Sequence, residues 1–368
     1  MVSNVIKKRA GYAAGEIFSV AAADENGTEL SNGTFFLTET SYGKDKIKTL
    51  LVCGLGTPVQ NRRQGLIRSM VTEMQTLAVN EGAAVALLHP FSFAYYGKFG
   101  YERVADHVIV EFPTADIDFV PRRCGFIPYD DSKLSDMISV YNEFSRGRNL
   151  LLPRYDKSRY TGADRQAYIY YDNGKPAAYI VVSGEKTLYV NNYINTVLNV
   201  RELCYVSPAA LSEVFSFLRM YEGEYDRIRF YDCSLCPEFD LMLRHYTRAE
   251  YKIIPDVAAR VLNTEKMLSA AEYPEKEGRF TLRVTDAMNT VNGVYRVQFG
   301  GGQSRVEKLG GDAEPQITLT AAAFTKIVYG KAPDAKTAAY MNGVTVCDPK
   351  TDLFRAFPPR PCGAFEHF

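Results

Sequence analysis

The segment LVCGLGTPVQNRRQGLIR, residues 51–68, reads as the end of a strand, a basic turn and the start of a helix. The apolar run Leu50–Leu55 is typical of a buried strand, and Thr57 and Pro58 end it. From Leu66 onward, apolar side chains recur every three or four residues, which is the spacing of an amphipathic helix. The order is therefore strand, glycine-containing basic turn, helix.

The turn between this strand and helix has the composition of an anion site. The first N–H groups of a helix lack intrahelical partners and, with the macrodipole, carry about half a positive charge. Gly65 lets a phosphate approach the backbone, and Arg62, Arg63 and Arg68 add full charges. The turn is neither a P-loop nor a GxGxxG dinucleotide motif. A pyrophosphate suits it, although a helix start with solvated arginines explains the same residues.

Two blocks of the sequence resemble acetyltransferase motifs. Arg62–Ile67, RRQGLI, resembles the R-x-x-G-x-G/A acyl-CoA motif of the GNAT N-acetyltransferases, with isoleucine where many members have a small residue. Tyr95–Tyr101, YYGKFGY, follows a predicted strand at Val85–Pro90 and resembles the YGRFGY block of the enhanced intracellular survival (Eis) branch. That branch ends on an aromatic residue, as this chain does at Phe368. The resemblance covers most of the chain.

The resemblance implies two catalytic residues. Tyr96 matches the first tyrosine of YGRFGY, the family's proton donor, and a phenol with a pKa near 10 can donate to a thiolate and be recharged from water. The carboxylate of Phe368 would be the base, with its ring anchored in an apolar slot. The alternative for Tyr96 is a packed core aromatic, in a chain with 25 tyrosines. The alternative for Phe368 is a frayed chain end.

The resemblance also implies an acetyl-CoA site. A splayed strand end would present a backbone N–H to the thioester oxygen, and the basic turn would hold the pyrophosphate. The residues expected to bind acetyl-CoA are Leu55, Gly56, Thr57, Arg63, Gln64, Gly65, Leu66, Ile67, Arg68, Phe91 and Ser92. No metal is expected, because the sequence lacks an H-E-x-x-H motif and its four histidines are dispersed.

Composition indicates a multidomain protein of ordinary solubility. At 368 residues, the chain should hold two or three domains of about 150 residues each. Lys plus Arg and Asp plus Glu both number 43, so no global charge favours nucleic acid or an anionic membrane surface. We expect a cytoplasmic protein, since no signal peptide or transmembrane run is visible. The seven cysteines, including the only CxxC at Cys233–Cys236, are predicted to be reduced thiols.

Three domains are expected, in an α/β (α+β) architecture of two GNAT-like mixed sheets and a final sheet-and-helix unit. Residues 1–118 would form the GNAT acetyltransferase domain, with a leader that looks shortened. Residues 119–255 repeat the strand-then-helix order, but the turn Ser207–Ala210 has neither glycine nor arginine, which indicates a degenerate GNAT-like domain without CoA binding. Residues 256–368 resemble the sterol-carrier-protein-like domain that closes Eis-type chains.

Hydrophobic periodicity predicts individual elements along the chain. Ala10–Ala23 fits either a helix or a strand, and Gly300–Gly302 is predicted to be a hairpin turn. Strands are predicted at Phe35–Thr38, Lys48–Leu55, His107–Glu111, Gln166–Tyr171, Ala177–Val182, Leu188–Tyr193, Arg201–Val206, Phe280–Thr285, Gly293–Phe299, Ser304–Leu309 and Gln316–Thr320, and helices at Leu134–Phe144, Ala209–Tyr221, Ala321–Tyr329 and Lys350–Phe357.

The expected activity is acetyl transfer from acetyl-CoA to a primary amine by direct attack in a ternary complex. Resemblance to Eis-type enzymes implies aminoglycosides or other small-molecule amines as acceptors, and a hexamer. Neither a nucleic acid nor a membrane is expected as a partner. The alternative is a non-catalytic protein that binds CoA or an apolar ligand on the same scaffold.

Overall fold

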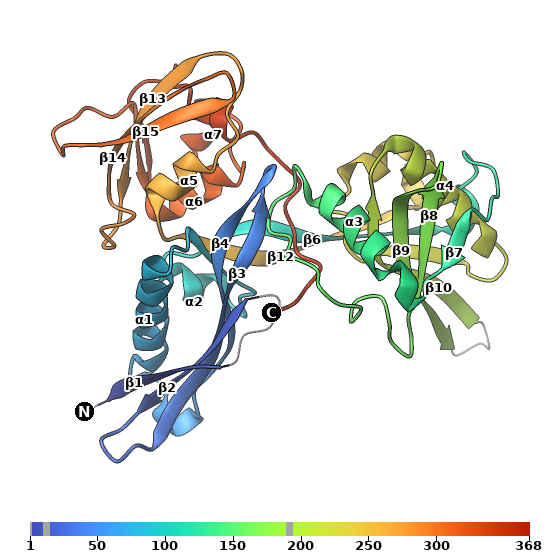
Figure 1. Cartoon of the computed structure of the whole chain (residues 1–368), viewed down its shortest axis with the longest axis horizontal. Helices are drawn as coiled ribbons and strands as arrows, with labels where there is room; N and C mark the ends of the chain where they lie inside the picture. The colour runs from blue at the N-terminus through green and yellow to red at the C-terminus, as the bar shows by residue number, and fades with distance from the viewer. Residues whose placement is uncertain (1, 10–14, 189–193) are drawn as a thin grey trace. The chain divides into compact units, whose positions relative to one another are not determined.

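The computed structural model describes residues 2–9, 15–188 and 194–368. The chain divides into two compact units (Figure 1). The first comprises Met1–Ala105, Asn149–Leu152 and Asp256–Phe368, and the second comprises Asp106–Arg148 and Pro153–Pro255. Within the described ranges, no helix is both long enough and apolar enough to cross a membrane.

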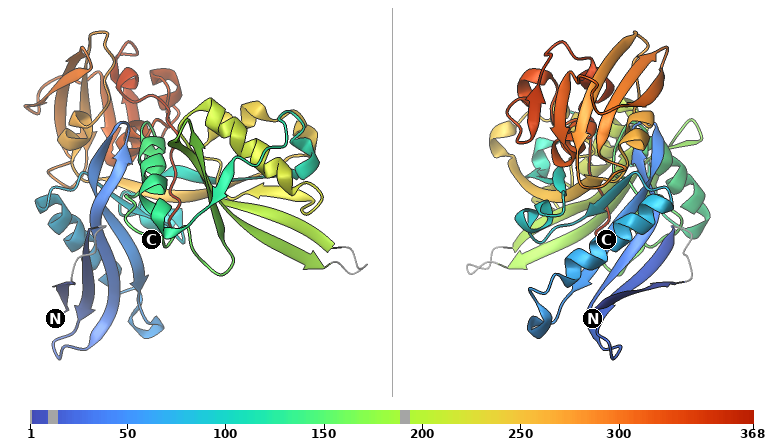
Figure 2. Two further views of the ribbon diagram at one scale, coloured as in Figure 1. Left: turned by 45° about the vertical axis from the view of Figure 1, so that its right-hand side comes forward. Right: turned by 90° about the vertical axis from the view of Figure 1, so that its left-hand side faces the viewer.

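The first unit contains a mixed sheet with the strand order β1-β2-β3-β4-β5-β12 (Figures 1 and 2). Strands β1 to β4 are antiparallel neighbours, whereas β5 runs parallel to β4 and antiparallel to β12. Helix α1 makes the crossover from β4 to β5. The bounds are β1 Ser3–Lys8, β2 Glu16–Ala23, β3 Glu29–Tyr42, β4 Asp45–Gly56, α1 Leu66–Asn80, β5 Val85–Leu88 and β12 Glu250–Val261, of which the residues from Asp256 onward lie in this unit.

These elements confirm the predicted strand, turn and helix around residues 51–68. The ambiguous leader is a strand from Glu16 onward, and residues 10–14 lie outside the described ranges. The described residues before β3 form two strands and no helix. The strand predicted at Val85–Pro90 is confirmed as β5, which ends at Leu88.

The two faces of this sheet bury different cores, as the alternation of side chains in a strand requires. Leu50 and Val52 of β4 pack with the apolar face of α1, which includes Met70 and Met74. Leu51, between them, packs instead with side chains of the C-terminal part of the chain. Burial of each such side chain contributes roughly 1.5–3 kcal/mol. The middle of β4 is therefore held by core packing on both of its faces.

The C-terminal part of the first unit has a second sheet, in the order β15-β14-β13-β16-β17. Tyr42 of β3 donates a hydrogen bond of 2.9 Å to the carbonyl of Val328 in α6. The predicted turn at Gly300–Gly302 is confirmed, since it joins β14 to β15. The bounds are α5 Thr264–Ser269, β13 Gly278–Thr285, β14 Gly293–Gly300, β15 Gln303–Leu309, β16 Ile317–Thr320, α6 Ala321–Val328, α7 Ala335–Ala338, β17 Val344–Val346 and α8 Leu353–Ala356.

The second unit is built on a sheet in the order β6-β11-β10-β9-β8-β7. Helix α4 crosses from β10 to the parallel strand β11, so that β10-α4-β11 repeats the order of β4-α1-β5. The bounds are β6 Glu102–Pro113, of which the residues from Asp106 onward lie in this unit, β7 Phe126–Pro128, α3 Leu134–Ser145, β8 Gln166–Asp172, β9 Lys175–Leu188, β10 Ile194–Tyr205, α4 Pro208–Leu218 and β11 Arg227–Phe230.

The strand predicted at Arg201–Val206 is confirmed, whereas nearly all of the one predicted at Leu188–Tyr193 lies outside the described residues. Leu188, the predicted start of one strand, is the last residue of β9, and residues 189–193 lie outside the described ranges. The strand predicted at Arg201–Val206 is the second half of the longer strand β10. A register shift between Val200 and Glu202 interrupts the pairing of β10 with β9 at the start of the predicted range.

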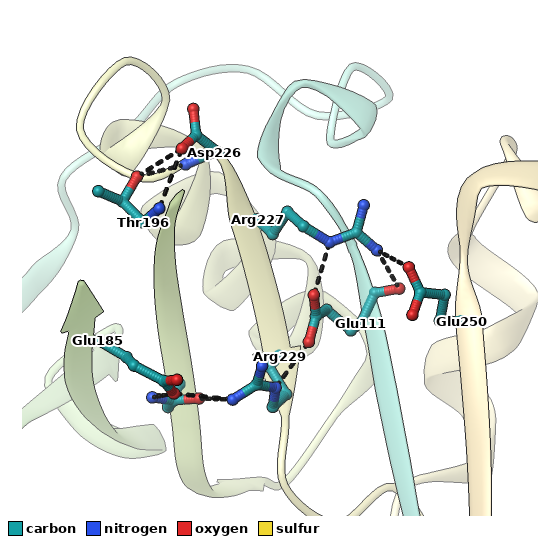
Figure 3. A network of polar contacts seen from close by, with 8 residues as sticks. Glu111, Glu185, Thr196, Asp226, Arg227, Arg229 and Glu250 are labelled. Atoms are coloured by element: carbon teal, nitrogen blue, oxygen red, sulfur yellow. Dashed lines mark hydrogen bonds and ion pairs between the residues drawn. The ribbon is translucent and has the colours of Figure 1, made fainter. Parts of the chain in front are cut away.

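Charged side chains link the strands of the second unit (Figure 3). The Glu111 carboxylate accepts hydrogen bonds of 2.6 Å from both Arg227 and Arg229. Arg229 also bonds Glu185 at 2.8 Å, and Arg227 bonds Glu250 at 2.9 Å. Each guanidinium thus lies between two carboxylates, which stabilises the register of β11 against β6.

Candidate functional site

Strand β4 separates from β5 before it ends. The parallel pairing of the two strands stops at Leu51, opposite Leu87, while β4 continues to Gly56. On its other edge, β4 carries one more residue than β3 near Gly54, whose φ of 55° is that of a glycine in a β-bulge. The last residues of β4 therefore lie beyond the pairing with β5, where an extended ligand can pair with the backbone.

The turn after β4 leaves the start of α1 without a side-chain cap. Arg63 and Gly65 both adopt left-handed backbone, with φ of 64° and 79°. Gly65 is the N-cap of α1 and offers no side-chain acceptor, whereas Ser92 caps α2 (Phe93–Gly97) and Ser207 caps α4 through their hydroxyl oxygens. The N-terminus of α1 thus directs its partial positive charge at an external acceptor.

A cavity of about 770 Å³ lies at this turn. Nothing is within 4 Å of the position that a Cβ of Gly65 would occupy, so the backbone is approachable there. The cavity volume falls within the range of small-molecule sites. It is lined by Leu55, Thr57, Asn61, Arg62, Arg63, Gln64, Gly65, Leu66, Ile67, Arg68, Phe91, Tyr95, Tyr96, Lys98 and Phe99.

The charged side chains that line the cavity are all basic. They are Arg62, Arg63, Arg68 and Lys98, and no carboxylate is among the described residues of the wall. Arg62 donates a 3.1 Å hydrogen bond to the carbonyl of Thr57, and the Arg68 guanidinium lies 5.0 Å from the centre of the Phe99 ring. These contacts orient two of the cations without neutralising them. The cavity is therefore suited to a ligand with several negative charges.

Tyr96 is enclosed at the edge of the same cavity. It lies in α2, is 6% exposed, and packs edge-on against Phe91 and Tyr95, with ring centres 5.5 and 5.2 Å away. Burial, with a smaller contribution from Tyr95, raises the pKa of Tyr96 to about 12. Its hydroxyl has no hydrogen-bond partner in the part of the chain that the structure describes. The phenol is thus protonated at neutral pH and free to donate to a ligand.

The structure gathers most of the residues predicted for acetyl-CoA at this cavity. All of them except Gly56 and Ser92 line it. The Gly56 carbonyl accepts a hydrogen bond from Ser31, and the Ser92 hydroxyl caps α2. Arg62, predicted as a charge of the anion-binding turn, also lines the cavity. The residues that were missed are Asn61, Tyr95, Lys98 and Phe99, of which the last three belong to the YYGKFGY block.

Phe368 is not among the residues that line the cavity and packs beside His89, two residues before the cavity residue Phe91. Its ring centre is 4.5 Å from that of His89, and its side chain packs against the larger core of the first unit. His89 Nδ1 is 2.8 Å from Oδ1 of Asp256, and its Nε2 is 3.1 Å from the carbonyl oxygen of Glu366. The C-terminal residues are therefore docked on the sheet.

Two segments of the chain match known domain families. Residues 7–104 match the family described as acetyltransferase (GNAT) domain. The first unit thus begins with a GNAT domain. In it, the splayed β4, the basic turn and α1 all fall within the matched residues. Residues 264–361 match the sterol carrier protein domain family, so the second sheet of this unit is sterol-carrier-like.

Solved structures of similar fold span nearly the whole chain. A GCN5-related N-acetyltransferase from Anabaena variabilis has 17% identity and a TM-score of 0.81, over 95% of this chain and 89% of that one. A probable N-acyltransferase from Enterococcus faecalis has 16% identity and a TM-score of 0.79, with both chains fully covered. Eis1 from Mycobacterium abscessus has 14% identity and a TM-score of 0.74, over 95% and 90%. No curated protein matches in sequence.

Proposed function

We propose that this chain is an acetyl-CoA-dependent N-acetyltransferase that acetylates primary amines. The observation that carries the proposal is one cavity that joins an uncapped helix N-terminus, four basic side chains and an enclosed tyrosine. The GNAT domain at residues 7–104 agrees with it. An Eis-type enzyme that acts on aminoglycosides, forms hexamers and works in the cytoplasm is the specific form of this proposal.

The residues around the cavity fit acetyl-CoA. The pyrophosphate would lie at the turn Arg63–Arg68, where backbone N–H groups and guanidinium groups are available. The pantetheine arm would pair with the free edge of β4 near Leu55, since amide groups of an extended ligand can replace a strand. Phe91 and Tyr95 supply apolar walls beside Tyr96.

The proposed reaction is direct acyl transfer. The amine nitrogen attacks the thioester carbon, a C–N bond forms, and the C–S bond breaks as the sulfur leaves with its electron pair. Tyr96 donates its proton to that sulfur, and the proton of the amine passes to the carboxylate of Phe368. With a pKa of about 12, Tyr96 keeps its proton throughout the neutral range, so it is available as a donor when the sulfur gains negative charge, and the phenolate is reprotonated from water afterwards.

The other parts of the chain receive supporting roles in this proposal. We assign residues 1–118 to the acetyltransferase domain, 119–255 to a degenerate GNAT-like domain and 256–368 to a sterol-carrier-like domain that carries the terminal carboxylate. In the second of these, the hydroxyl of Ser207 accepts the N–H of Ala210, and Pro208 opens helix α4. This cap occupies the donors that a phosphate would need, which supports the loss of CoA binding.

The decisive test is the release of CoA thiol from acetyl-CoA in the presence of amines. Untagged protein should release thiol with at least one amine from a panel of aminoglycosides and lysine peptides, and should bind CoA in calorimetry. Binding without turnover across the panel would favour the non-catalytic alternative. Absence of CoA binding would overturn the assignment of the cavity.

The proposed base makes a separate prediction about the chain end. A short Gly-Ser extension after Phe368 moves the carboxylate away, so kcat should fall by about 10²-fold or more while the Kd for CoA stays the same. The same extension placed before Met1 is the control. If both extended proteins turn over like the untagged one, the terminal carboxylate is not the base.

A further inference from the structure

Two of the four histidines meet at one point of the first unit, although they are 278 positions apart along the chain. His89 follows β5, and His367 is the last residue but one. Their ring centres are 4.6 Å apart. Asp256 of β12 completes the group, and one potential ligand atom from each of the three residues lies within 4.8 Å of the others.

The chemistry of this group is that of a transition-metal site. Two imidazoles and a carboxylate are a common ligand set for Zn²⁺, Co²⁺, Ni²⁺ and related ions, and ligand atoms bound to one zinc ion at about 2.0–2.2 Å lie closer to one another than 4.8 Å. Small rotations of the His367 side chain, which is exposed, would close the remaining distance. His89 and Asp256 are nearly buried, with 14% and 12% of their side chains exposed, so their positions are set by the fold.

Both ring nitrogens of His89 face oxygen atoms of the protein. Its Nδ1 faces a carboxylate oxygen of Asp256, and its Nε2 faces the carbonyl oxygen of Glu366. An ion bound to Nδ1 would have Asp256 Oδ1 within reach as a second ligand. The Nε2–H would then donate to the Glu366 carbonyl, and this outer contact would orient the imidazole.

We propose that His89, Asp256 and His367 form a binding site for a divalent transition-metal ion that fastens the C-terminal end of the chain to the sheet. The ion would connect the penultimate residue to the segment after β5 and to β12. A chain end that is not held in this way usually frays. At least one coordination position would be left for water. The inference does not rest on the proposed function, since binding and tail attachment are measured without acetyl-CoA.

Cobalt and zinc binding to the untagged, chelator-treated full chain tests the site. We expect one Co²⁺ per chain, with the visible absorption of a nitrogen- and oxygen-bound ion and no thiolate-to-cobalt charge transfer. His367→Gln should weaken Co²⁺ and Zn²⁺ binding at least tenfold. His245→Gln is the matched control, because His245 is also exposed and paired with a carboxylate, that of Asp118, but lies in the other unit. It should leave binding unchanged.

Attachment of the chain end is measured with a metal-independent serine carboxypeptidase. Zn²⁺ should slow the release of Phe368 from the wild-type chain and from His245→Gln, and should not slow it from His367→Gln. The proposal is overturned if no metal binds at 1 mM, if His367→Gln binds like wild type, or if the cobalt spectrum shows thiolate ligands. It is equally overturned if Zn²⁺ leaves the rate of Phe368 release unchanged in the wild type.

Discussion

At the scale of single residues, the environment of Tyr96 sets its protonation state. Aromatic rings surround it, and burial raises its pKa to about 12, so that it is a protonated donor throughout the neutral range. Its neighbour Tyr95 also lines the cavity but is only partly buried. The two tyrosines therefore offer a direct comparison of one side chain in two settings.

Replacement of Tyr96 by phenylalanine should separate catalysis from binding. The ring and its packing remain in Tyr96→Phe while the donor is lost, so kcat should fall about 10²-fold or more with the Kd for CoA within twofold. Tyr95→Phe is the matched control and should change kcat by less than about threefold. Steady-state kinetics and calorimetry measure both quantities, and equal turnover of the two variants would remove Tyr96 from the mechanism.

At the scale of elements, two helices in equivalent positions begin in different ways. Both α1 and α4 follow a strand and cross to a parallel neighbour. The first begins at a left-handed glycine without a side-chain cap, and the second begins with a serine cap and a proline. The difference in a few residues at the helix start decides whether the helix N-terminus can accept an anion.

A negative charge at the start of α1 should abolish its attraction for phosphate. Aspartate tolerates left-handed backbone better than most residues, so Gly65→Asp should cost only about 1 kcal/mol of stability while it weakens CoA binding tenfold or more. Gly174→Asp is the control, since Gly174 has a φ of 78° and also has nothing within 4 Å of a Cβ, but lies in the β8–β9 turn. CoA titrations and urea unfolding distinguish the two effects. A Gly65→Asp protein that binds CoA normally would contradict the phosphate site.

At the scale of the whole molecule, buried phenols make stability sensitive to alkaline pH. Burial raises the pKa of both Tyr96 and Tyr101 to about 12, above the value near 10 of an unfolded tyrosine. The unfolded state then loses these protons first, so the stabilisation is complete below pH 10 and is lost as the pH rises toward 12. Each such phenol should lower the free energy of unfolding by about 1.4 kcal/mol at pH 11.

Tyr101→Phe tests this pH dependence. Between pH 8 and pH 11, the variant should lose about 1.4 kcal/mol less of its free energy of unfolding than the wild type. Tyr340→Phe, at a side chain that is 87% exposed, should lose as much as the wild type. Urea unfolding at the two pH values gives the difference within each protein. Equal losses in all three proteins would mean that Tyr101 does not titrate differently when folded.

Helices, strands and turns could be predicted from the sequence because they depend on residues that are close together along the chain. Apolar spacing located α1 and the hairpins, and the glycine and arginines of one turn located most of the cavity wall. Lys98 and Phe99 were missed although they belong to the YYGKFGY block, because the spacing of that block does not indicate which side chains point toward the basic turn at Arg63. Of the long strand β10, only the second half was predicted, and the register shift against β9 lies where that half begins.

Only the tertiary structure could show which distant segments of the chain pack against one another. The separation of β4 from β5 depends on pairings between distant segments, and so does the docking of the chain end. His89, Asp256 and His367 carry no sequence spacing that indicates a metal, and they meet only because β12 pairs with β5 and the C-terminal residues return to the end of β5. Secondary structure follows from neighbours in the chain, whereas a site built from three segments follows from the packing of the sheet.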